Sequence, residues 1–126
     1  MHSLLRLDNV MYFVSDLDRA QKFYEDALGL KQVWRDEDRK MIGYQMSKST
    51  SEIVIHADPS LPKFDYSFLV KDVVSFCEQV RQAGFYVVRD PFDVRCGKFA
   101  LLEDQDGNII PIIDLTAFGG VARYDS

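Results

Sequence analysis

The alternation of apolar and polar residues predicts a strand that runs directly into a helix near the start of the chain. Residues 9–14 are rich in β-branched and aromatic side chains, as in a strand covered on both faces. Ser15 and Asp16 can cap a helix, and apolar residues then recur at three- and four-residue spacing. These residues are Leu17, Ala20, Phe23, Tyr24, Ala27 and Leu28. Gly29 stands where helices commonly end in a left-handed residue.

The same pattern occurs a second time. A strand over residues 65–70 precedes Asp72, a second apolar stripe follows, and Gly84 ends it. Asn9 and Asp65 are 56 residues apart, and so are Asp16 and Asp72. A period this long indicates a duplicated supersecondary module rather than a short structural repeat.

Three further strands are predicted after each helix, which gives each module the order β-α-β-β-β. In the first module they cover residues 30–35, 41–46 and 52–56. In the second they cover residues 85–89, 98–103 and 109–113, with a loop from Pro91 to Cys96. The fold class is therefore α+β, with two tandem β-α-β-β-β modules whose eight strands form a curved cup.

The whole chain, residues 1–126, is expected to form a single domain. Two prolines in five residues indicate a linker. The expected divisions are module one at about 7–57, a linker at 58–63, module two at about 64–114 and a tail at 115–126.

Composition narrows the possible partners and compartments. A net charge of −5 argues against nucleic acid as a partner, because such surfaces need clustered Lys and Arg. No apolar run reaches the roughly 20 residues that span a membrane, and charge interrupts the N-terminus too early for a secretory signal. Cys77 and Cys96 fit a reducing compartment. We therefore expect a cytoplasmic protein.

Several short motifs occur in a fixed order within the doubled unit. They are Asp16-Leu17, Phe23-Tyr24 followed by Leu28-Gly29, Gly97-Lys98, and the turn Asp104-Gln105-Asp106-Gly107-Asn108. In this order they resemble the vicinal oxygen chelate superfamily, which contains glyoxalases, bleomycin-resistance proteins and extradiol dioxygenases. The resemblance covers residues 7–114 and implies a glyoxalase/bleomycin-resistance fold and a homodimer.

The resemblance also implies where a metal would bind. Enzymes of this family hold one divalent metal, such as Zn, Ni, Fe or Mn, with ligands from the first and last strand of each module. The first-strand positions fall here on Asn9 and Asp65. The last-strand position falls on Pro111 in module two, and on Val54 or His56 in module one. Because Asn is a weak ligand and Pro has no side-chain donor, we expect a degenerate site. Any metal present would be bound by Asn9, His56 and Asp65.

The leading hypothesis is thus a protein without a cofactor that sequesters a small organic molecule, as bleomycin-resistance proteins do, and not an enzyme. The alternative is a divalent-metal-dependent glyoxalase- or dioxygenase-like enzyme with an atypical metal site. No catalytic residue is assigned. Strand alternation and the resemblance predict these ligand-binding residues: Asn9, Met11, Phe13, Trp34, Val54, His56, Asp65, Ser67 and Pro111. The alternative interpretation is that His56 is a hydrogen-bonded histidine without a ligand role, and that Asn9 and Asp65 cap turns.

Overall fold

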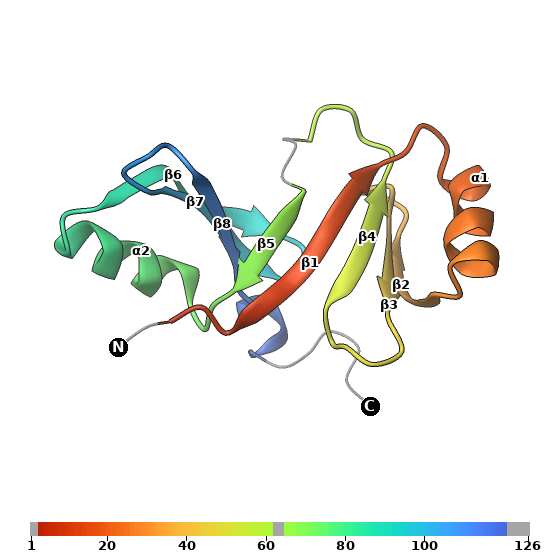
Figure 1. Ribbon diagram of the computed structural model, residues 1–126, viewed down its shortest axis with the longest axis horizontal. Coiled ribbons are helices and arrows are strands. Elements are labelled where there is room, and N and C mark those ends of the chain that lie inside the picture. Colours follow the sequence, from red (N-terminus) through yellow and green to blue (C-terminus); the bar gives the residue numbers. More distant parts are fainter. Residues whose placement is uncertain (1–2, 62–64, 121–126) are drawn as a thin grey trace. The chain divides into compact units, whose positions relative to one another are not determined.

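The computed structural model describes residues 3–61 and 65–120 (Figure 1). The chain divides into two compact units, a first module of residues 8–66 and a second module of residues 67–120 together with residues 3–7. Each contains the order β-α-β-β-β. The α+β class and the duplicated module predicted from the sequence are therefore confirmed.

The first module has four strands in the spatial order β2-β3-β4-β1. β1 runs parallel to β4, while β2, β3 and β4 pair antiparallel. Its elements are β1 (Arg6–Phe13), α1 (Leu17–Lys22), η1 (Phe23–Ala27), β2 (Lys31–Asp36), β3 (Met41–Gln45) and β4 (Glu52–His56).

Local chemistry determines where the first helix begins and ends. Asp16 caps α1, since its carboxylate accepts a hydrogen bond from the Arg19 N–H at 3.1 Å. The expected single helix instead widens into the π-helical turn η1, where Leu28 N donates to Phe23 O across five residues. Gly29, at φ 68°, then ends the helical segment.

One face of the first module's sheet packs under α1 and η1. The fully buried residues of this core are Ile42, Tyr44 and Ile55, and Val14, Leu17, Ala20 and Tyr24 pack against them. Because side chains alternate along a strand, the intervening residues of β3 and β4 project from the opposite face of the sheet.

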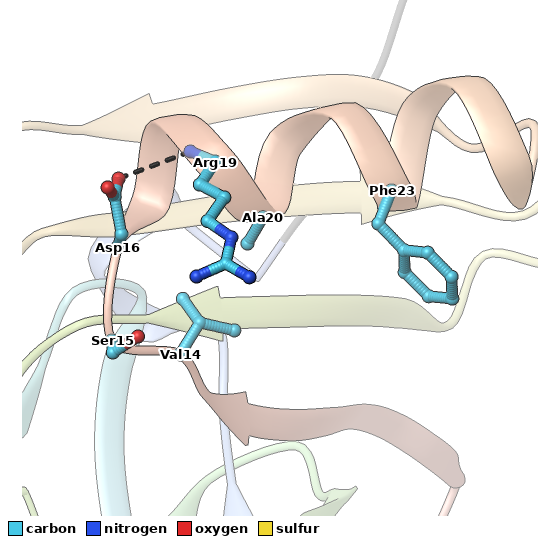
Figure 2. A pocket seen from close by; sticks show the side chains of 6 residues that line it. All are labelled: Val14, Ser15, Asp16, Arg19, Ala20 and Phe23. Atoms are coloured by element: carbon cyan, nitrogen blue, oxygen red, sulfur yellow. Dashed lines mark hydrogen bonds between the residues drawn. The ribbon is translucent and has the colours of Figure 1, made fainter.

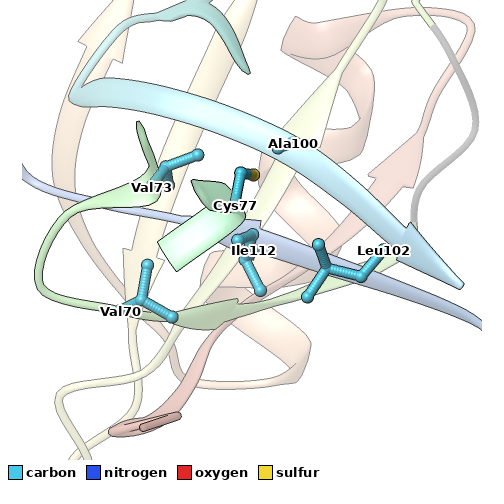
Figure 3. Close-up of a cluster of buried hydrophobic side chains, with 6 residues drawn as sticks. All are labelled: Val70, Val73, Cys77, Ala100, Leu102 and Ile112. Atoms are coloured by element: carbon cyan, nitrogen blue, oxygen red, sulfur yellow. The ribbon is translucent and has the colours of Figure 1, made fainter. Parts of the chain in front are cut away.

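The second module has the strand order β5-β8-β7-β6. Its elements are β5 (Tyr66–Leu69), α2 (Val73–Gln82), β6 (Tyr86–Val94), β7 (Gly97–Glu103), β8 (Ile109–Ile113) and the 3-10 turn η2 (Thr116–Phe118). Its buried core joins α2 to the sheet and consists of Val70, Val73, Cys77, Ala100, Leu102 and Ile112 (Figure 3).

β6 differs from the sequence-based expectation. It continues from Tyr86 to Val94, whereas a loop was predicted from Pro91 onward. β6 is the outermost strand of the module's order, and its register with β7 shifts between Arg89 and Phe92. A proline is tolerated at such an irregular outer position because its missing N–H removes no ladder hydrogen bond.

Asp114 connects three elements of the second module. This fully buried carboxylate accepts hydrogen bonds from the backbone N–H of Val73 and of Lys98, both at 2.8 Å. It also accepts from the Thr116 N–H and hydroxyl. The start of α2, the start of β7 and η2 are therefore held by one side chain.

Within the described ranges, the helices lack the length and apolar character needed to cross a bilayer.

Candidate functional site

The sheet face opposite α1 carries most of the ligand-binding residues predicted for the first module. The β1–β4 register pairs Asn9 with Glu52, Met11 with Val54, and Phe13 with His56, so the members of each pair project from the same face. Gly43 pairs with Val54 on one side and with Trp34 on the other. We call this set the site face. It consists of Asn9, Met11, Phe13, Trp34, Gly43, Glu52, Val54 and His56.

The Trp34 indole lies against Gly43 of β3 on the site face. A Cβ added to Gly43 would overlap the indole atoms Cε2 and Nε1, so glycine is what lets the ring lie against the strand. The indole N–H donates to Glu52 Oε1 at 3.0 Å. Glu52 is only 1% exposed, and a buried carboxylate is costly unless it is hydrogen-bonded. Trp34 and Glu52 therefore stabilise each other's position.

Sequence reasoning missed Glu52. The strand face of Glu52 could have been predicted, because Glu52 lies two residues before Val54 and four before His56 and so shares their face. Its pairing with Asn9 depends on the β1–β4 register, which no local sequence pattern specifies.

His56 lies at the other end of the site face and is 6% exposed. Its Nδ1 accepts a hydrogen bond from the Asp58 N–H at 3.3 Å, and its ring meets Phe13 edge-on at 5.7 Å between ring centroids. Burial lowers the pKa of His56 below its ordinary value of 6.5, while the neighbouring charge of Asp58 acts in the opposite direction. The ring is therefore neutral near pH 7.

The remaining predicted residues lie in different surroundings. Asn9 is buried and its Nδ2 donates to Asp8 at 2.8 Å. Asp65 is exposed, and its backbone oxygen accepts from Met11 N at 2.8 Å. In the second module, Ser67 is buried and lies beside Pro111, one step before the Phe68–Ile112 pair.

The residues at the expected metal positions do not fit one ion. Asn9 pairs with Glu52 and His56 with Phe13, so Asn9 and His56 are four residue steps apart along the strands. At about 3.3 Å per step their Cα atoms are roughly 13 Å apart, and both side chains would have to bridge this span to bring donor atoms within about 4 Å of each other, as metal–ligand distances near 2 Å require. No group of three His, Cys, Asp or Glu suited to a metal occurs among residues 3–61 and 65–120. The set Asn9, His56 and Asp65 is therefore not gathered as the family's site would require.

A small pocket of about 190 Å³ lies at the start of α1, beside the loop that leaves β1 (Figure 2). The Arg19 side chain extends along it toward Val14. The pocket is lined by Val14, Ser15, Asp16, Arg19, Ala20 and Phe23. It is smaller than most small-molecule sites, and none of its lining residues belongs to the site face.

Comparison with known proteins identifies curated relatives that cover almost the whole chain. The lactoylglutathione lyase of Haemophilus influenzae is 30% identical over an alignment that covers 90% of each chain. A probable lactoylglutathione lyase of Synechocystis is 27% identical over an alignment that covers 93% of this chain and 95% of the relative.

Solved structures share the fold. Methylmalonyl-CoA epimerase from Mycobacterium tuberculosis has a TM-score of 0.66 at 22% identity, covering 86% of this chain and 87% of that one. A Streptomyces coelicolor methylmalonyl-CoA epimerase variant has a TM-score of 0.68 at 17% identity, covering 98% and 99%. At these identities the likeness establishes the fold alone.

These relatives correct two expectations. The hypothesis of a metal-free, bleomycin-resistance type of binding protein was wrong, because the curated relatives are named as lactoylglutathione lyases. The expectation of no cofactor was wrong for the same reason. The family resemblance implies a divalent metal in the enzymes of the family, and these relatives are named as enzymes. The alternative of a glyoxalase-like enzyme has the better support. The sequence pattern of the Glyoxalase/Bleomycin resistance protein/Dioxygenase superfamily matches residues 6–112, and the chain belongs to this superfamily.

Proposed function

We propose that the protein is a glyoxalase-type lyase that acts on S-lactoylglutathione and its precursors, glutathione and methylglyoxal. The observation that carries this proposal is the 30% identity to a lactoylglutathione lyase across 90% of both chains. The family match over residues 6–112 includes all strands of the first module, and therefore the site face.

The site face has the composition of a small-molecule site. Met11, Phe13 and Trp34 supply apolar and aromatic surface, and the side chains of Asn9 and His56 supply polar groups among them. Ligand sites typically combine a mainly apolar wall with a few positioned polar groups. Trp34 is held against Gly43 by Glu52, so its ring is already oriented before a ligand arrives, which reduces the entropy lost on binding.

The direct test is to measure, by ultraviolet absorbance, the formation of a thioester from methylglyoxal and glutathione. The protein is assayed as purified, after treatment with EDTA, and with added Zn²⁺, Ni²⁺, Fe²⁺ or Mn²⁺. Methylmalonyl-CoA serves as a second substrate that separates lyase from epimerase activity. Turnover of methylglyoxal and glutathione above the protein-free rate supports the proposal. No turnover under any metal condition contradicts it.

Two phenylalanines provide a matched pair of variants. Phe13 on the site face is 49% exposed, and Phe23 beside the α1 pocket is 56% exposed. Phe13→Ala should lower kcat/KM about tenfold, the effect of losing about 1.4 kcal/mol of binding. Phe23→Ala should leave kcat/KM unchanged, because Phe23 lies outside the site face. Equal losses in both variants would contradict the placement of the substrate.

We also propose that the protein works as a cytoplasmic homodimer. The superfamily resemblance supports the dimer, since cavities of this family are often completed across subunits. Cys77 and Cys96 are buried and are not joined in a disulfide, which supports a reducing compartment. Sedimentation should give a mass near twice 14.5 kDa, and a monomer at every concentration would contradict the dimer.

A further inference from the structure

The hydrogen bond on His56 determines which ring nitrogen carries the proton. A backbone N–H can only donate, so His56 Nδ1 accepts from the Asp58 N–H at 3.3 Å. A neutral imidazole has one N–H, and with Nδ1 acting as acceptor that proton is on Nε2. His56 is therefore a hydrogen-bond donor at Nε2.

The backbone on either side of His56 is fixed in the orientation that this tautomer needs. Val14 N donates to His56 O at 2.8 Å, which holds the end of β4 against the chain leaving β1. The Asp58 carboxylate accepts from the Ser60 N–H at 2.9 Å and from the Ser60 hydroxyl at 2.6 Å. This turn holds the Asp58 peptide, so its N–H remains directed at the ring.

The arrangement is the opposite of that around a typical metal-bound histidine. A metal ligand binds through a bare ring nitrogen, while its other nitrogen donates to a carboxylate or carbonyl. In His56 the bare nitrogen, Nδ1, is already occupied by an N–H donor. The roughly 13 Å between His56 and Asn9 along the strands also argues against a shared ion.

We propose that His56 donates a hydrogen bond through Nε2–H to the substrate oxygen on which negative charge develops, from the same strand face on which the family resemblance would place a metal ligand. This inference rests on the proposed function and deepens it. The ring lies on the site face, beside the partly exposed Phe13. A fixed donor in a largely buried setting stabilises such an oxygen without having to reorient, and removing one donor of this kind typically costs 10²–10³ in kcat.

The tautomer can be read without substrate. The chain has two histidines, His2 and His56, so His2→Gln leaves His56 as the one imidazole in a long-range ¹H–¹⁵N spectrum. After EDTA treatment we expect the Nε2-protonated pattern, unchanged by one equivalent of Zn²⁺. S-lactoylglutathione at saturation should shift the Nε2 resonance. An Nδ1-protonated ring, a Zn²⁺-dependent shift, or an unaltered Nε2 resonance with S-lactoylglutathione would each overturn the inference.

Three substitutions separate a donor from a metal ligand. His56→Gln keeps an N–H donor and should retain kcat within about tenfold, whereas His56→Phe should lose about 100-fold. His56→Glu supplies an acceptor of the kind the family uses to bind metal, and should be as impaired as His56→Phe. Higher activity in His56→Glu than in His56→Gln, or a metal content that changes among the variants, would overturn the inference. Urea unfolding of each variant identifies any loss caused by misfolding.

The two proposals fail in different ways. A wild-type chain without turnover contradicts the proposed function. The wrong tautomer in a chain that does turn over contradicts only the role of His56.

Discussion

Replacing Gly43 by Ala perturbs the site face at one defined contact. The backbone of Gly43 does not have a positive φ, so alanine is compatible with the strand itself. In a strand interior, Gly→Ala normally stabilises a protein by roughly 0.5–1 kcal/mol. Here the new methyl group would overlap the Trp34 indole, and the ring must move away.

The cost of that movement is set by the bond between Trp34 Nε1 and Glu52 Oε1 at 3.0 Å. A hydrogen bond to a charged group contributes about 1.5–3 kcal/mol, and a buried carboxylate that loses its donor keeps its desolvation cost. After the intrinsic gain from alanine is subtracted, Gly43→Ala should lower the free energy of unfolding by about 1–2 kcal/mol.

The same substitution should change sign when Trp34 is absent. In a Trp34→Ala background there is no indole to displace, so Gly43→Ala should stabilise by roughly 0.5–1 kcal/mol. The difference between the two backgrounds is the coupling energy of a double-mutant cycle. Urea unfolding monitored by far-ultraviolet circular dichroism measures all four proteins, including the two that lack tryptophan.

Fluorescence gives a second, local measurement because Trp34 is the single tryptophan in the chain. Gly43→Ala should shift the emission of the folded protein to longer wavelength as the indole leaves its buried contact. If Gly43→Ala stabilises the wild-type chain, or if the emission is unchanged, the reasoning about Trp34, Gly43 and Glu52 is refuted.

Three further predictions concern the second module, pH and metal. Asp114→Asn should destabilise by about 2–4 kcal/mol in urea unfolding, because the amide NH2 replaces one of the two oxygens and places a donor against the N–H of either Val73 or Lys98; a loss below 0.5 kcal/mol would contradict this. The pKa of His56 is lower in the folded chain than its ordinary value of 6.5, so the unfolded chain binds the proton first as pH falls. The free energy of unfolding should therefore decrease below pH 6.5, by at most about 1.4 kcal/mol per pH unit. His56→Gln should remove this decrease and His2→Gln should retain it. The family resemblance implies a divalent metal, while the described residues do not gather a family-type ligand set, so any bound metal should be held weakly. Brief dialysis against EDTA should therefore abolish activity and added metal should restore it; metal retained through dialysis would contradict this.

The fold could be predicted because its signals are local and occur twice. Each module presents an Asp cap, an apolar helical stripe and a terminal glycine, and both caps act through their carboxylates, at Asp16 and Asp72. The π-helical turn η1 was missed because its five-residue hydrogen bond leaves the apolar stripe intact. β6 was cut short because Pro91 ends strands in most positions and is tolerated here at an outer, irregular one.

The candidate site could be predicted less completely from the sequence, because it depends on the register between strands that are far apart in the chain. Alternation along β1 and β4 predicts which residues share a face, and Asn9, Met11 and Phe13 do share one with Val54 and His56. Alternation does not determine the register, that is, which residue of β1 lies opposite which residue of β4. Asn9 lies beside Glu52 and not beside His56, so only the register separates the two expected ligands and reveals Glu52.

The register also decides which residue of the first module corresponds to Pro111. Met11 and Ser67 are equivalent through the 56-residue offset of the repeat. Met11 pairs with Val54, and Ser67 lies beside Pro111. Val54, not His56, is therefore the structural counterpart of Pro111, and neither residue has a side-chain donor. His56 lies one step further along the same face, where the Asp58 N–H fixes its tautomer. Its polar chemistry thus comes from a position that the internal repeat does not duplicate: two residues beyond Pro111 the second module has Ile113.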